Sequence, residues 1–197
     1  MHQHYYSTDP KSLSKPQFLE TIVRGVPLRL KTDTGVFSKD KIDKGSRLLA
    51  ETVLVNRDDH ILDLGCGYGV IGLTLAALAP EGQVLLVDVN TRSLELAQEN
   101  AKLNGLTNVN FRFSDGFTAV EETFDLIVTN PPIRAGKGVY YPFVDGAFDH
   151  LRSGGRFAAV VQTKQGAKSF AQKIETVFGN VETLAKSGGY RILLAIK

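Results

Sequence analysis

Several features are scarce in this chain of 197 residues, and each scarcity excludes a class of protein. The single cysteine, Cys66, excludes an internal disulfide framework, and the four histidines show no metal-ligand spacing, so no metal site is expected. No apolar run has the length of a membrane helix, and residues 1–6 lack the apolar core of a signal peptide. The net charge of +2 is too small to indicate a nucleic-acid partner by bulk electrostatics. We therefore expect a cytoplasmic protein with no membrane association, in which any polyanionic partner would need a local basic patch.

Short apolar strands alternate with helical periods from residue 60 onward. We predict strands over residues 61–64, 83–89, 109–113, 124–129, 156–161, 181–185 and 190–196. We predict helices over residues 70–79, 92–103, 143–151 and 168–178. This alternation is typical of an α/β fold with a mostly parallel sheet and helices on both faces. The last two strands, joined across Gly188 and Gly189, are expected to be antiparallel.

The first 57 residues follow a different pattern from the rest of the chain. Residues 1–19 show no clear period, and we expect them to be loosely ordered. Residues 21–30 alternate around Gly25 and Pro27 as a hairpin would, and a helix is expected to start near Asp43 or Ser46. We predict that residues 1–57 pack on a core formed by residues 58–197, giving one compact domain overall.

The most informative motif is Asn130-Pro131-Pro132, directly after a predicted buried strand. Two successive prolines cannot continue a sheet, so they fix a rigid turn at the end of that strand. The amide oxygen of Asn130 and a neighbouring backbone carbonyl are then two acceptors at the mouth of the sheet. Two acceptors suit an NH2 group, and the motif therefore indicates chemistry on a nitrogen, although Asn and Pro are also ordinary turn residues.

A glycine-rich loop, Asp63-Leu64-Gly65-Cys66-Gly67-Tyr68-Gly69, links the first predicted core strand to its helix. Glycines at alternate positions let a ligand approach the main chain closely. Residues 67–72 also match the dinucleotide pattern G-x-G-x-x-G, but Asp63 would repel a bound diphosphate. An acidic site favours a ligand with an ammonium or sulfonium group, and this favours S-adenosylmethionine over NAD. We expect Cys66 to be a small packing residue of the loop.

Two further carboxylates end predicted strands. Asp88 follows the second core strand, where it could bind both ribose hydroxyls, and Asp115 follows the third, where it could accept from an adenine amino group. The carboxyl ends of parallel strands meet at one edge of an open sheet. Asp63, Asp88, Asp115 and Asn130 are therefore expected to converge on one site.

These motifs together resemble those of the Rossmann-like S-adenosylmethionine-dependent methyltransferases. The closer similarity is to the small-domain group that includes ribosomal RNA guanine-N2 methyltransferases, and it rests on Gly35-Val36-Phe37-Ser38, residues 130–137 and Gly189-Tyr190-Arg191. The resemblance implies a seven-stranded sheet with an antiparallel last strand. Many members carry a further amino-terminal half for which this chain has no room, so the exact RNA target is not implied.

The resemblance also implies a role for each motif. The methionine portion of S-adenosylmethionine would lie on the loop with Gly65, Cys66, Gly67 and Gly69, with Asp63 near its ammonium. The ribose would lie at Asp88-Val89-Asn90 and the adenine at Asp115-Gly116. Asn130, Pro131 and Pro132 would form the catalytic turn, in which the Asn130 side-chain oxygen and the Pro131 carbonyl hold the target amine.

The predicted substrate is guanine N2 in ribosomal RNA, so RNA is the expected partner; the oligomeric state is left open, with a monomer compatible with the sequence. Ile133 stands where related enzymes carry an aromatic residue, so stacking on the base would come from Phe37 or Tyr140. Arg134 and Lys137, beside the turn, are candidate phosphate or guanine contacts. The alternatives are N-methylation of a protein glutamine or of adenine N6 and, in another class, an NAD-dependent oxidoreductase.

Overall fold

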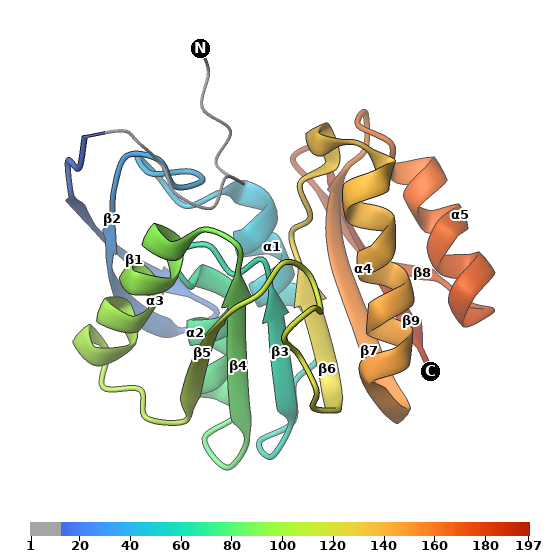
Figure 1. The fold of residues 1–197 in the computed structure, drawn as a ribbon, viewed down its shortest axis with the longest axis horizontal. Helices are drawn as coiled ribbons and strands as arrows, with labels where there is room; N and C mark the ends of the chain where they lie inside the picture. The colour runs from blue at the N-terminus through green and yellow to red at the C-terminus, as the bar shows by residue number, and fades with distance from the viewer. Residues whose placement is uncertain (1–12) are drawn as a thin grey trace.

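The structure is a computed structural model that describes residues 13–197 (Figure 1). The loose order expected for residues 1–12 lies outside the described residues. In the described part of the chain, no helix combines the length and the apolar character needed to cross a membrane.

Two strands and a helix precede the central sheet, and helices and strands then alternate. The first three elements are β1 (Gln17–Val23), β2 (Val26–Thr32) and α1 (Lys44–Thr52). The next six are β3 (His60–Leu64), α2 (Val70–Leu78), β4 (Gln83–Asp88), α3 (Thr91–Leu103), β5 (Val109–Phe113) and β6 (Phe124–Thr129). The last six are the 3-10 turn η1 (Ile133–Ala135), α4 (Lys137–His150), β7 (Leu151–Gln162), α5 (Ala167–Phe178), β8 (Glu182–Ser187) and β9 (Tyr190–Ile196).

Seven strands form the central sheet in the order β5-β4-β3-β6-β7-β9-β8. The strands from β5 to β7 are parallel to one another, and β9 is antiparallel to both of its neighbours. The predicted fold class is therefore confirmed. Strand order reverses between β3 and β6, and ligand crevices in open α/β sheets form outside the carboxyl ends of the strands at such a reversal.

Alternation along the strands gives the sheet two apolar faces. Ile61 of β3 and Leu126 of β6 belong to a cluster with α1, α2 and α3, whereas Leu62 and Ile127 belong to a second cluster with α4 and α5. Side chains of successive strand residues point to opposite faces, so a strand buried on both sides is apolar throughout. Helices accordingly cover both faces, with the β1–β2 hairpin at one end of the molecule and α5 at the other (Figure 1).

The hairpin and α1 belong to the first of these clusters through Val23, Leu30 and Leu49. Two side chains of α3 also bond to the backbone of β2. Asn100 accepts from the Lys31 N–H at 2.6 Å and donates to its carbonyl at 3.0 Å, and Asn104 does the same to Arg29 at 2.9 and 2.8 Å. These contacts hold β2, the strand that leads to residues 33–43, against α3.

Three predicted boundaries differ from the structure by more than two residues. Strand β1 begins at Gln17, inside the segment expected to lack regular structure, because it pairs with β2 along its whole length. Helix α4 begins at Lys137, six residues before the predicted start, although it contains Gly138 and Pro142. Strand β7 begins at Leu151 and runs through Gly154-Gly155, where its pairing with β6 shifts in register.

Candidate functional site

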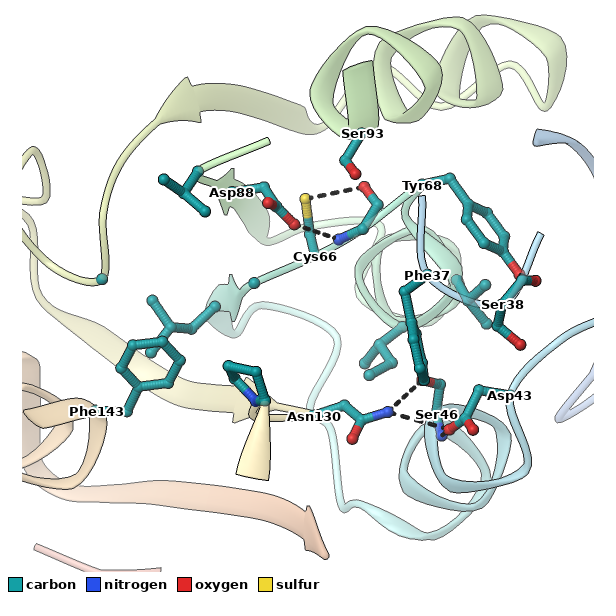
Figure 2. A pocket seen from close by; sticks show the side chains of 18 of the residues that line it. Phe37, Ser38, Asp43, Ser46, Cys66, Tyr68, Asp88, Ser93, Asn130 and Phe143 are labelled. Atoms are coloured by element: carbon teal, nitrogen blue, oxygen red, sulfur yellow. Dashed lines mark hydrogen bonds between the residues drawn. The ribbon is translucent and has the colours of Figure 1, made fainter. Parts of the chain in front are cut away.

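A cavity of about 310 Å³ opens at the carboxyl ends of β3, β4 and β6 (Figure 2). Its lining comes from the segment before α1, the glycine-rich loop, the ends of β4 and β5, the Asn130 turn and the start of α4. Figure 2 shows Asp88 and Asn130 on opposite sides of this space. Among the residues predicted for the site, the lining includes Phe37, Gly65, Cys66, Gly67, Asp88, Val89, Asp115, Gly116, Asn130 and Pro132.

The glycine-rich loop forms one wall of the cavity with its backbone. Gly65, Gly67 and Gly69 have φ values of 74°, 57° and 97°, a region that other residues rarely adopt. A Cβ at Gly65 or Gly67 would meet no protein atom within 4 Å, so both positions face open space. The N–H groups of Gly65 and Cys66 donate to the Val87 carbonyl at 2.9 and 3.0 Å, which ties the loop to β4. The loop thus provides a surface that a ligand can approach at backbone distance.

The Cys66 side chain is a packing group of this loop. Its thiol is buried and lies 3.4 Å from the Gly67 carbonyl. Burial and the nearby charges of Asp88 and Asp63 raise the pKa of the Cys66 thiol. A thiol with a raised pKa is a poor nucleophile, so the geometry fits packing rather than covalent catalysis.

Asp88 connects the loop to the end of β4. Its two carboxylate oxygens accept from the N–H groups of Gly67 and Asn90, each at 2.8 Å. Burial raises the pKa of Asp88, and these backbone bonds lower it in part. A carboxylate has about four lone-pair sites, and backbone N–H groups of Gly67, Val89 and Asn90 use three of them, so Asp88 can still accept from a ligand at the cavity wall.

Asp63 is fully buried behind the loop and does not line the cavity. One oxygen accepts from the Gly72 N–H at 2.7 Å, and the other has no hydrogen-bond partner in the described structure. Burial, reinforced by the charge of Asp88, raises the pKa of Asp63 to about 7. A buried oxygen without a partner is costly and needs a donor, and the ammonium group of a methionine moiety is such a donor.

Asn130 is held by residues at the start of α1. Its side-chain nitrogen donates to Asp43 Oδ2 at 3.1 Å and to Ser46 Oγ at 2.9 Å. Figure 2 shows this nitrogen turned toward Ser46 and Asp43, with the amide oxygen turned away from them. The end of β6, directly before the turn, is also fixed, because Thr129 Oγ1 donates to the Leu64 carbonyl of β3 at 2.8 Å. The turn therefore presents one amide oxygen in a defined orientation.

The other predicted residues of the turn lie around the cavity rather than in its wall. Pro131 is buried, and its carbonyl already accepts from the Ile133 N–H at 2.8 Å, which leaves one lone pair for a ligand. Ile133, Arg134 and Lys137 do not line the cavity, and the last two are exposed. Gly69 and Asn90 are likewise outside the lining, so the ligand roles predicted for these residues stay predictions.

The aromatic side chains that line the cavity are not all those that the sequence suggested. Phe37 lines the cavity and is 36% exposed, but Tyr140 is buried and packs edge-on against Phe170. The suggestion that Tyr140 could stack on a base is therefore wrong. Phe143 lines the cavity instead, close to Gly116, and Figure 2 shows it opposite Phe37 relative to Asn130.

Sequence reasoning missed the residues that complete the wall. Asp43 and Ser46 were noted only as possible helix starts, yet both line the cavity together with Tyr68, Val139 and Phe143. The Tyr68 hydroxyl donates to the Ser38 carbonyl at 3.3 Å, and burial and the charge of Asp43 raise the pKa of Tyr68. The pattern Asp43-x-Gly45-Ser46, which combines a helix cap with a glycine, was the available signal.

Basic segments extend from the Asn130 turn along the same edge of the sheet. Residues 130–141, 163–172 and 185–191 contain no Asp or Glu. The first two segments adjoin, since the Tyr141 hydroxyl donates to the Ser169 carbonyl at 3.2 Å. The last two adjoin, since Thr163 N–H donates to the Gly189 carbonyl at 2.8 Å. The basic side chains of these three segments, called the basic edge below, are Arg134, Lys137, Lys164, Lys168, Lys186 and Arg191.

The sequence is similar to a family of methyltransferase domains and to several known proteins. The family model of the methyltransferase small domain matches residues 27–194. The Bacillus subtilis (strain 168) protein YbxB is 42% identical over 200 residues, which cover 100% of both chains. Ribosomal RNA small subunit methyltransferase C of Salmonella choleraesuis (strain SC-B67) is 32% identical over 169 residues, 84% of this chain and 48% of the relative.

A solved structure extends this similarity to three dimensions. It is the T. thermophilus 16S rRNA N2 G1207 methyltransferase in complex with AdoMet and guanosine, 31% identical, with a TM-score of 0.83. The match covers 95% of this chain and 52% of that one. The chain therefore spans about half the length of these two RNA methyltransferases.

Proposed function

Because the chain belongs to the methyltransferase small-domain family, we propose that it is an S-adenosylmethionine-dependent N-methyltransferase acting on guanine N2 in ribosomal RNA. Its relatives support this activity, since one is named as a ribosomal RNA methyltransferase and another was solved with AdoMet and guanosine. Membership in a methyltransferase family argues against the NAD-dependent alternative.

The cavity fits S-adenosylmethionine, which supplies a methyl group on a sulfonium that a nucleophile can displace. Gly65 and Gly67 leave room for a ligand at the backbone. Asp63 lies behind the loop, so its unpartnered oxygen would reach the ammonium group through a bridging water. Asp88 would accept from the ribose hydroxyls, and Asp115 and Gly116 would lie at the adenine. The acid behind the loop disfavours a diphosphate, so the donor set favours this cofactor over a dinucleotide.

The orientation of Asn130 is the observation that carries the proposal. With its nitrogen bonded to Asp43 and Ser46, Asn130 has its oxygen left to accept from a substrate. An exocyclic amine is a poor nucleophile while its lone pair is conjugated with the ring. Acceptors at its two protons, the Asn130 oxygen and the remaining lone pair of the Pro131 carbonyl, would hold the protons so that the lone pair faces the donor.

Positioning and desolvation would then provide most of the catalysis. The N–CH3 bond would form as the S–CH3 bond breaks, and the sulfonium would leave as a neutral thioether. No side chain needs to act as a general base, because the methylated nitrogen carries a positive charge and can release its acidic proton to water. Phe37 and Phe143 line the cavity on either side of Asn130 and could pack on a planar base.

The basic edge supports RNA as the substrate rather than a protein. Five of its six side chains are exposed, and the loops that carry them contain no carboxylate. Neutralisation of phosphates by Lys and Arg provides most sequence-independent affinity for nucleic acids. A local basic surface beside the reactive turn is thus compatible with the small net charge of the whole chain.

The test is transfer of a tritiated methyl group from S-adenosylmethionine to total RNA, followed by identification of the labelled nucleoside. We expect label in N2-methylguanosine, and RNA from cells lacking the gene should be the best acceptor because its target is unmodified. Label in protein glutamine or in adenine N6 alone would overturn the RNA proposal. Calorimetry that detects binding of NAD and none of S-adenosylmethionine would overturn the methyltransferase proposal itself.

A further inference from the structure

We propose that Asp43 is a positioning residue that decides which end of the Asn130 amide faces the substrate. The inference rests on the proposed function, because it assigns to α1, at the other end of the chain, a part in presenting the substrate acceptor. Asp43 lies 87 positions before Asn130, and its Oδ2 accepts from the Asn130 side-chain nitrogen at 3.1 Å.

The argument depends on the chemistry of the two partners. An amide side chain has a donor end and an acceptor end of nearly the same shape, so packing alone does not select between them. A carboxylate has only acceptors. Were the amide reversed, two oxygen atoms would face each other at about the present 3.1 Å. Asp43 therefore fixes the nitrogen inward and, as a consequence, the oxygen outward.

Ser46 cannot make this choice, although its hydroxyl is the nearer partner. Ser46 Oγ accepts from Asn130 at 2.9 Å, but a hydroxyl can donate as readily as accept and would satisfy either end of the amide. Ser46 adds a hydrogen bond to Asn130, whereas Asp43 determines which end of the Asn130 amide faces inward. This distinction separates our proposal from a general role in packing.

The surroundings of Asp43 hold its carboxylate in place. Oδ2 also accepts from the Ser46 N–H at 2.8 Å as the cap of α1, and Oδ1 lies 3.4 Å from the Tyr190 hydroxyl. The Tyr190 hydroxyl in turn accepts from Gln162 Nε2 at 2.9 Å. A Cβ on Gly45 would lie 2.8 Å from the Tyr190 ring and 2.9 Å from Asp43 Oδ2, so only glycine fits between them.

Capping and orientation can be separated by one substitution. Serine caps helices about as well as aspartate does, so Asp43→Ser should keep α1 intact. Its hydroxyl can donate as well as accept, so it no longer selects which end of the Asn130 amide faces it, and the amide can turn its oxygen inward. Asp43→Asn is the conservative counterpart, because the oxygen that caps the Ser46 N–H is the same Oδ2 that accepts from Asn130 and should keep the amide in place.

The experiment compares methyl transfer by wild type, Asp43→Ser, Asp43→Asn and Ser46→Ala, with Asp40→Ser as an exposed acidic control on the same segment. We expect Asp43→Ser to lower kcat about tenfold, the scale of one hydrogen bond to a charged group. Asp43→Asn should recover most of this loss, Ser46→Ala should lower kcat about twofold, and Asp40→Ser should leave it unchanged. S-adenosylmethionine affinity and Tm should stay near wild type in Asp43→Ser. A loss of activity in a variant that keeps the helix cap, recovered by asparagine, is not what a merely structural role predicts.

The conservative variant provides the rescue. Asp43→Asn keeps an oxygen that can accept both from the Ser46 N–H and from the Asn130 side-chain nitrogen. We expect Asp43→Asn to be more active than Asp43→Ser. A wild-type kcat for Asp43→Ser, or an Asp43→Asn variant no more active than Asp43→Ser, would overturn the inference.

A second readout does not depend on which substrate is correct. In 15N-labelled protein, the side-chain NH2 signal of Asn130, assigned by its loss in Asn130→Ala, should be shifted and slow to exchange with water. Asp43→Ser should move this signal and speed its exchange, and an unchanged signal in that variant would overturn the inference. If label enters protein or DNA instead of RNA, the RNA proposal fails, but the kcat ratios measured on that acceptor still test the role of Asp43.

Discussion

The two sides of Asn130 differ in charge, and the difference indicates that they bind different molecules. On one side lie Asp63, Asp88 and Asp115, at or near the ends of β3, β4 and β5. On the other side lie the loops after β6 and β7 and before β9, which contain the basic edge and no carboxylate. The acidic side suits a cationic methyl donor, and the basic side suits a polyanionic acceptor. The net charge of +2 therefore conceals a local separation of charge at the site.

The largest expected effect separates the two sides kinetically. Asn130→Ala should lower kcat about 1,000-fold, because the acceptor that orients the amine is lost, while S-adenosylmethionine affinity changes by less than about 1 kcal/mol. Calorimetry with the cofactor and single-turnover methyl transfer measure the two quantities. Asp88→Ala is the matched variant on the acidic side and should instead weaken cofactor binding first. If both variants lose cofactor affinity equally, the division between the two sides is wrong.

The acidic side should also make stability depend on pH. The pKa of Asp63 is raised to about 7, so the folded protein keeps a proton that the unfolded chain has lost between pH 4 and 7. Stability without cofactor should therefore fall as pH rises through this range and level off above it, with a total change of a few kcal/mol. Thermal unfolding at pH 5 and pH 8 measures this.

Two substitutions identify the group responsible for that dependence. Asp63→Asn should bring the Tm values at pH 5 and pH 8 closer together. Asp125→Asn is the control, because the neighbouring Arg152 and the His60 N–H hold the pKa of Asp125 below its usual value, outside this range. A pH dependence that persists in Asp63→Asn and disappears in Asp125→Asn would contradict the assignment.

The smallest expected effect tests the basic side. The triple variant Arg134→Ala/Lys137→Ala/Lys164→Ala should weaken RNA binding about tenfold at moderate salt and flatten the dependence of affinity on salt concentration. Cofactor binding should not change. Lys102→Ala, an exposed cation at the end of α3, is the control. Equal losses for the triple variant and Lys102→Ala would mean that the basic edge is not the RNA-binding surface.

Much of this arrangement could be predicted from the sequence because its causes are local. The family and the fold class are confirmed. Buried strands can be recognised from their apolar composition. The prolines of Asn130-Pro131-Pro132 fix a turn by covalent geometry, and residues that end parallel strands meet at one edge of the sheet. The start of α4 was missed because Gly138 and Pro142 are ordinary stop signals, whereas here the helix continues through both.

The partner of Asn130 could not be predicted, because nothing local links it to Asp43. The two residues are far apart in sequence and meet only when α1 packs beside the sheet. The same holds for Phe143 of α4, which meets Gly116 at the cavity wall only through tertiary packing. The ends of strands can be predicted from neighbouring residues in the sequence, but a contact between a helix cap and a distant turn depends on tertiary packing.

The two asparagines of α3 have a consequence for the behaviour of the whole molecule in a crowded cell. An uncovered strand edge is a template on which another chain can add a strand, and a two-stranded sheet has little else to discourage this. The side-chain amides of Asn100 and Asn104 bond to the N–H and C=O groups of Lys31 and Arg29 as a neighbouring strand would. Two side chains at the end of α3 thus occupy backbone groups at the edge of β2 that another chain could otherwise bind. The strand that precedes Phe37 and Asp43 is therefore less open to aggregation through this edge.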